Sequence, residues 1–169
     1  MVLITSVSRR LRTPLFLSIS LFITVLTFAQ VNLAYRLLNG YTLSSEASVN
    51  KNKPTVFVLS ETEAFEKVFN PAVTTKRPDA INFTKEAAIG IVLPPTTKPP
   101  KLSISKVFVQ DSVLTVRYIR LADTTLTQHP QLIATQPLLL VAVPKHNFLK
   151  TKLVENGKVV QILKKPEED

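Results

Sequence analysis

The sequence predicts a mainly β fold of the α+β class: an antiparallel β-sandwich or open barrel of about seven strands with one short covering helix. From Thr55 onward, short β-branched and aromatic runs alternate with turn residues. The stretch after Ser60 is the one place where apolar residues recur at helical spacing. Asn156-Gly157 lies between two apolar runs, a strong hairpin signal because both residues tolerate the positive φ of a type I′ turn.

The first two predicted elements are a strand and the helix. TVFVLS at 55–60 is rich in β-branched residues and predicts the first strand. Ser60 stands three residues before Glu63, which predicts a capping box at the start of the helix. Asn70-Pro71 ends the helix, since the residue before a proline disfavours the α region. The apolar face of the helix consists of Ala64, Phe65, Val68 and Phe69.

Six further strands and a long loop follow. AAIGIVL at 87–93 and LLLVAV at 138–143 are apolar at every position, which predicts central strands covered on both faces. The runs 101–110 and 112–121 flank Asp111 and predict a hairpin. LKTKLVENGKVVQIL at 149–163 predicts the last hairpin. Between the hairpins, residues 122–137 form a long polar connection, and long loops in compact domains are often functional.

The loop from Pro94 to Pro100 contains four of the 12 prolines of the chain. Proline cannot donate to a sheet ladder, so Pro94 and Pro95 end the preceding strand and Pro99 and Pro100 delay the next one. We expect Thr96-Thr97-Lys98 to be an extended, poorly hydrogen-bonded loop with little entropy to lose on binding. Protection of a sheet edge explains the same prolines equally well.

The N-terminus predicts export. Residues 1–29 contain a basic segment, an apolar run and Thr27-Phe28-Ala29 before a cleavage point, as in a signal peptide. The mature chain would begin at Gln30 and be periplasmic or extracellular. The alternative is an uncleaved anchor formed by residues 14–34. We expect a linker or leader at 30–53, a β-rich domain at 54–163 and a charged tail at 164–169.

Composition limits the partners. The chain has no cysteine, which excludes disulfides and thiolate metal sites. Its net charge is +9, and three of its 21 basic residues lie in the signal segment. Export argues against nucleic acid as a partner, and a membrane is expected only if the signal stays uncleaved. An anionic envelope surface, an acidic partner and a merely solvated basic surface remain open.

The residues predict no catalytic site, no metal site and no cofactor, so we do not expect an enzyme. His129 and His146 are the only histidines, and without cysteines or a carboxylate cluster they fall short of a zinc site. Ser60 has no nucleophile-elbow motif around it. The three glycines cannot supply a phosphate-binding loop.

Three segments carry a family resemblance: FVLSETEAFEKVF at 57–69, INFTKEAAIGIVL at 81–93 and IATQPLLLVAVPK at 133–145. Their order and pattern resemble the C-terminal domain of the PrcB family, subunits that associate with an extracytoplasmic protease complex. The resemblance covers residues 54–163. The family tends to carry a Thr-Gly-Gly-Tyr-like loop where this chain has Thr96-Thr97-Lys98-Pro99-Pro100.

Two functions follow as hypotheses. The first is a non-catalytic exported domain that binds another envelope or secreted protein, a protease being one candidate, as a stabilising or inhibitory subunit. The alternative is a structural or adhesive envelope component that binds anionic polymer or lipid head groups through a basic surface. For the first hypothesis, the candidate partner-binding residues are Thr96, Thr97, Lys98, Lys101, Thr127, Gln128, Thr135 and Gln136.

Overall fold

The computed structural model describes residues 30–73 and 76–164. Within them, the chain from Val31 onward forms one compact unit that is mainly β, with eleven strands and two helices, which confirms the predicted fold class. The predicted signal segment at 1–29 and residues 165–169 of the predicted tail lie outside the described residues.

One layer is a five-stranded sheet in the order β1-β7-β8-β10-β11. Neighbouring strands are antiparallel except β8 and β10, which run parallel. The prediction of an antiparallel arrangement is therefore wrong for this one pair of strands. The strand bounds are β1 Val31–Asn32, β7 Lys101–Gln110, β8 Val113–Leu121, β10 Lys150–Glu155 and β11 Lys158–Lys164.

The second layer is a four-stranded antiparallel sheet in the order β2-β9-β6-β4. Its bounds are β2 Arg36–Leu37, β9 Leu138–Pro144, β6 Glu86–Val92 and β4 Thr55–Leu59. The main core packs its inner side chains, such as Ile89 and Val141, against Val116 and Leu153 of the other sheet. The fold is therefore a β-sandwich.

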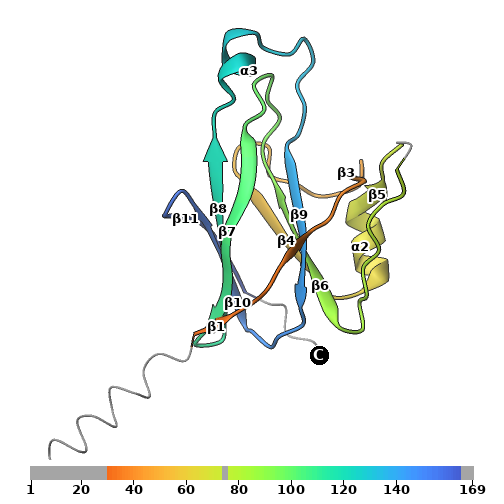
Figure 1. Cartoon of the computed structure of the whole chain (residues 1–169), viewed down its shortest axis with the longest axis vertical. Helices are drawn as coiled ribbons and strands as arrows, with labels where there is room; N and C mark the ends of the chain where they lie inside the picture. Colours follow the sequence, from red (N-terminus) through yellow and green to blue (C-terminus); the bar gives the residue numbers. More distant parts are fainter. Residues whose placement is uncertain (1–29, 74–75, 165–169) are drawn as a thin grey trace, which may run out of the picture. The chain divides into compact units, whose positions relative to one another are not determined.

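A third layer covers the other face of the four-stranded sheet. It consists of α2 (Thr62–Val68) and the ribbon of β3 (Tyr41–Leu43) and β5 (Phe69–Pro71) (Figure 1). Phe65 and Phe69 are buried there against Ala88 and Leu140. β6 and β9 are thus covered on both faces, as their unbroken apolar sequences predict.

The start of α2 differs from the prediction. The N-cap residue is Glu61, not Ser60, and no side chain caps the helix, so the predicted capping box is wrong. With the helix beginning at Thr62, Ser60 lies one residue too early for its hydroxyl to serve as the cap. The helix ends at Val68, and Phe69 then begins β5.

The segment expected to be a linker belongs to the fold. Within residues 30–53, β1, β2 and β3 pair with β7, β9 and β5 respectively, and Leu38 is buried. These strands have two or three residues each, too few for any hydrophobic period to show in the sequence. The linker prediction for 30–53 is therefore wrong over residues 31–43.

Both predicted hairpins are present. In the β10–β11 turn, Asn156 and Gly157 have φ values of 47° and 85°, as a type I′ turn requires. The β7–β8 turn repeats this pattern with Asp111 at 50° and Ser112 at 58°. Asn156 also exchanges side-chain hydrogen bonds with the backbone N–H and C=O of Arg120, both 3.0 Å long, which ties the turn to β8.

Candidate binding surface

The proline loop connects β6, which ends at Val92, to β7, which begins at Lys101, as its prolines predict. Thr96 and Thr135 form an isolated antiparallel bridge, in which each backbone N–H donates to the carbonyl oxygen of the other over 2.9 Å. The expectation of a poorly hydrogen-bonded loop is therefore wrong. Its partner is the second predicted loop, with Thr135 39 residues after Thr96 in sequence, and such long-range pairing does not show in local sequence patterns.

Further backbone bonds extend this contact. The Gln131 N–H donates to the Thr97 carbonyl over 2.8 Å, and the Leu93 N–H donates to the Pro137 carbonyl over 2.9 Å. The Lys98 N–H donates to the Thr96 hydroxyl over 3.0 Å. We call the surface formed by residues 94–101 and 122–137 the paired-loop surface. Its two segments bind each other through a bridge that lies outside the named strands, and only Lys101 belongs to a sheet, as the first residue of β7.

The long loop contains a short helix, α3 (Thr124–Gln128), that its polar sequence did not indicate. Asp123 caps this helix by accepting from the backbone N–H groups of Thr125 and Leu126. Lys101 Nζ lies 3.4 Å from Asp123 Oδ2. The Leu126 N–H, together with the Lys101 ammonium and the Thr125 N–H, lowers the pKa of Asp123. Asp123 therefore connects the start of β7 to α3.

All eight predicted partner-binding residues lie in the paired-loop surface, at the end of the sandwich where Figure 1 shows α3. The bridge joins Thr96 to Thr135, and Asp123 links Lys101 to the helix that holds Thr127 and Gln128. These residues are exposed or half-buried. The proline loop provides Thr96, Thr97 and Lys98, β7 provides Lys101, α3 provides Thr127 and Gln128, and the following loop provides Thr135 and Gln136.

Two exposed apolar residues of this surface were not predicted from the sequence. Leu132 is 102% exposed and Ile133 is 78% exposed, both between Gln131 and Thr135, which are bonded to the proline loop. The only sequence signal was an apolar dipeptide inside an otherwise polar loop. Large apolar side chains held in water are typical anchors for a partner.

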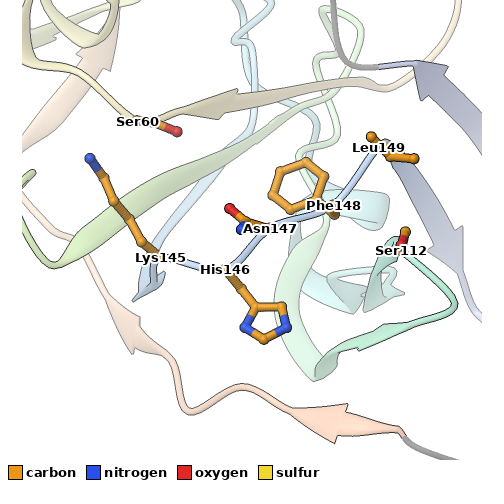
Figure 2. Close-up of a pocket in the computed structure, with 7 residues that line it drawn as sticks. All are labelled: Ser60, Ser112, Lys145, His146, Asn147, Phe148 and Leu149. Atoms are coloured by element: carbon orange, nitrogen blue, oxygen red, sulfur yellow. The ribbon is translucent and has the colours of Figure 1, made fainter.

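A further cavity lies outside the paired-loop surface. It has a volume of about 910 Å³ and is lined by residues of the β9–β10 connection with Ser60 and Ser112 (Figure 2). His146 and Phe148 point to opposite sides of their segment (Figure 2). Within residues 30–73 and 76–164, no carboxylate lines the cavity, so none of these residues provides an acid partner for His146 in general acid–base chemistry. His129 and His146 are both exposed.

The shifted titratable groups outside the paired-loop surface have structural explanations. Burial raises the pKa of Tyr118, and its hydrogen bond to the Glu155 carboxylate acts in the same direction. Arg36 forms a two-point pair with Glu86, whose pKa is lowered mainly by that hydrogen bond. Among residues 30–73 and 76–164, no group of three or more His, Cys, Asp or Glu side chains could hold a metal ion.

Comparisons with protein-family models, curated proteins and solved structures give no match. The PrcB-like resemblance therefore stays a prediction. In the part of the chain that the structure describes, no helix is long and apolar enough to cross a membrane.

Proposed function

We propose that this chain is a non-catalytic exported domain that binds another extracytoplasmic protein, a protease being one candidate, through the paired-loop surface. The observation that carries the proposal is the exposure of Leu132 and Ile133 on a loop whose backbone is already fixed. A constrained loop loses little entropy when a partner covers it. Burying two such side chains contributes about 3 kcal/mol or more, enough to dominate a small interface.

The test is affinity capture from envelope extract with the tagged chain, quantified by mass spectrometry. The test variant is Leu132→Ser with Ile133→Ser. The matched control is Val73→Ser with Leu149→Ser, since these side chains are 106% and 68% exposed and lie outside the paired-loop surface. Because all four side chains are exposed, neither pair should change the unfolding free energy by more than about 0.5 kcal/mol per substitution.

We expect wild type and control to recover the same extracytoplasmic protein and the Leu132/Ile133 variant to lose it. A second variant replaces residues 96–101 with Gly-Ser, which keeps the backbone groups of the bridge to Thr135 but removes Pro99, Pro100 and the side chains of the segment, and should weaken recovery as well. Equal recovery by all four proteins would contradict the proposed site. Equal loss in the Val73/Leu149 control would show that exposed apolar area, and not this surface, retains the captured protein.

A further inference from the structure

The outer face of the five-stranded sheet collects cations that are dispersed in the sequence. Side chains of directly opposed residues share a face, and every second residue of a strand points to the same side. Phe108 pairs with Thr115 on this face, and Lys106 pairs with Arg117 one step along. On the far strands, Lys152 opposes Ile162 and Lys150 opposes Lys164. We call this surface, with cations Lys106, Arg117, Lys150, Lys152 and Lys164, the basic sheet face.

Its five cations form a continuous track across four strands. Directly opposed pairs lie about 5 Å apart, and same-face neighbours on one strand about 7 Å apart. Lys152 faces Thr115 on β8, so it lies diagonal to Arg117 at about 7–8 Å. The track therefore runs from Lys106 through Arg117, Lys152 and Lys150 to Lys164, with steps of about 5–8 Å.

No carboxylate of the described chain pairs with this track. The three ion pairs found within residues 30–73 and 76–164 use Arg36, Lys101 and Arg120 instead. Two of the cross-strand pairs, Lys106 with Arg117 and Lys150 with Lys164, place like charges directly opposite each other. Such pairs are unfavourable in the free protein, and an anion between them would relieve the repulsion.

The centre of the face is hollow. A cavity of about 360 Å³ is lined by the cations Arg117 and Lys152 and by apolar residues that include Val154 and Val159. Among the residues that the structure describes, Asp111 in the β7–β8 turn is the one carboxylate that lines it. The ring of Phe108 lies below the cations, with Lys106 Nζ 5.3 Å and Arg117 Cζ 5.4 Å from its centroid.

We propose that the basic sheet face binds a linear acidic polysaccharide, a sugar chain carrying carboxylate or sulfate groups. A repeating anion fits a track of cations, and the apolar floor fits the apolar faces of sugar rings, which an inorganic polyphosphate lacks. A planar lipid surface touches protruding side chains and leaves a hollow unfilled, so it fits this face less well. This site shares no residue with the paired-loop surface and stands independently of the proposed function.

The test measures binding of the full chain to a heparin oligosaccharide at several salt concentrations. The test variant is Arg117→Gln with Lys152→Gln, and the control is Lys51→Gln with Lys53→Gln, exposed residues in the connection before β4 that change the net charge equally. We expect the test pair to lower the affinity about tenfold or more and the control to stay near wild type. The test pair should also reduce the salt dependence, since fewer counterions are displaced.

Two further variants separate loss of the binding site from loss of stability and from a change in net charge. Lys150→Gln with Lys164→Gln, both exposed, should weaken binding without destabilising the fold, because it removes a repulsive pair. Val159→Ser, a substitution in the apolar floor, should weaken heparin binding and leave polyphosphate binding unchanged.

Three results would overturn the proposal. Equal losses of heparin affinity in the test and control pairs would show that net charge, and not the basic sheet face, causes the binding. If polyphosphate of the same charge binds as tightly as heparin, the apolar floor does not contribute to binding and a sugar chain is not the preferred ligand. Binding to phosphatidylglycerol vesicles without binding to heparin would assign the face to lipid head groups instead.

Discussion

Thr96→Pro tests whether the paired-loop surface depends on the bridge between its two segments. The Thr96 N–H donates to the Thr135 carbonyl over 2.9 Å, and proline has no such donor. Its ring would also occupy the position from which that bond is made. Loss of one backbone hydrogen bond lowers local stability by about 1 kcal/mol, and displacement of the reciprocal bond brings the cost to about 1–2 kcal/mol.

Thr97→Pro is the matched control at the next residue. The Thr97 carbonyl accepts from Gln131, and its N–H makes no hydrogen bond in the described part of the chain. Proline at 97 restricts Thr96 to extended conformations, which the bridge already requires. Fewer conformations in the unfolded chain then make this variant neutral or more stable, by up to about 1 kcal/mol.

The assay is amide hydrogen exchange of Thr135, whose N–H donates to the Thr96 carbonyl. We expect exchange about five- to thirtyfold faster in Thr96→Pro than in wild type, and no acceleration in Thr97→Pro. Thr96→Ala separates the hydroxyl from the backbone, since it removes only the acceptor for the Lys98 N–H. If Thr135 exchanges equally fast in both proline variants, the two loops are not held by this bridge.

Three other perturbations test the fold and the capped helix. Gly90→Ala should lower the unfolding free energy by about 1–2 kcal/mol, because the added Cβ would lie 2.9 Å from Phe69 Cε2 and this overpacking outweighs the gain in strand propensity. A urea unfolding midpoint at or above that of the wild type would contradict this prediction. Asn156→Ala should cost about 2 kcal/mol in the same assay, because it loses two hydrogen bonds to β8 and keeps a positive φ, whereas Asn156→Gly should recover the part due to backbone strain. The pKa of Asp123 is lowered in the folded protein, so the ionised carboxylate stabilises α3 above the unfolded-state pKa of 3.8, and this stabilisation is lost as the pH falls through the lower folded-state value. The protection of the Thr125 amide against hydrogen exchange should follow this titration. In Asp123→Asn the protection should be independent of pH.

The seven strands predicted from the sequence correspond to β4 and β6–β11. They were predictable because each is long enough to show its burial pattern: β6 is buried from Ala87 through Val92, and β8 buries Leu114, Val116 and Tyr118. The Asn156-Gly157 turn was predictable because its conformation is a property of two residues. Patterns of this kind act over a few residues, where sequence is informative.

The missed features depend on partners far away in the chain. β1, β2, β3 and β5 are defined by pairing with distant strands, and their two or three residues have no pattern of their own. The Thr96–Thr135 bridge is of the same kind. Residues 94–101 and 122–137 could be chosen from proline content and loop length, but their mutual contact required the fold to place them together.

The basic sheet face shows why net charge alone could not locate a binding site. Lys106, Arg117, Lys150, Lys152 and Lys164 come from four strands and are separated in sequence by buried residues such as Val107, Val116 and Thr151, so these cations look dispersed. Strand alternation and register bring them to one side. A basic composition becomes a directed field only after pairing fixes which residues share a face.

The two proposed surfaces make a joint prediction, because they share no residue and rest on different physical terms. Binding at the paired-loop surface depends on apolar burial of Leu132 and Ile133, which added salt does not weaken. Binding at the basic sheet face depends on Arg117 and Lys152 and weakens as salt screens them. Effects at independent sites add, so a protein altered at both sites should show each loss unchanged. If altering one surface changes binding at the other, the sandwich couples them, and neither can be understood from its own residues alone.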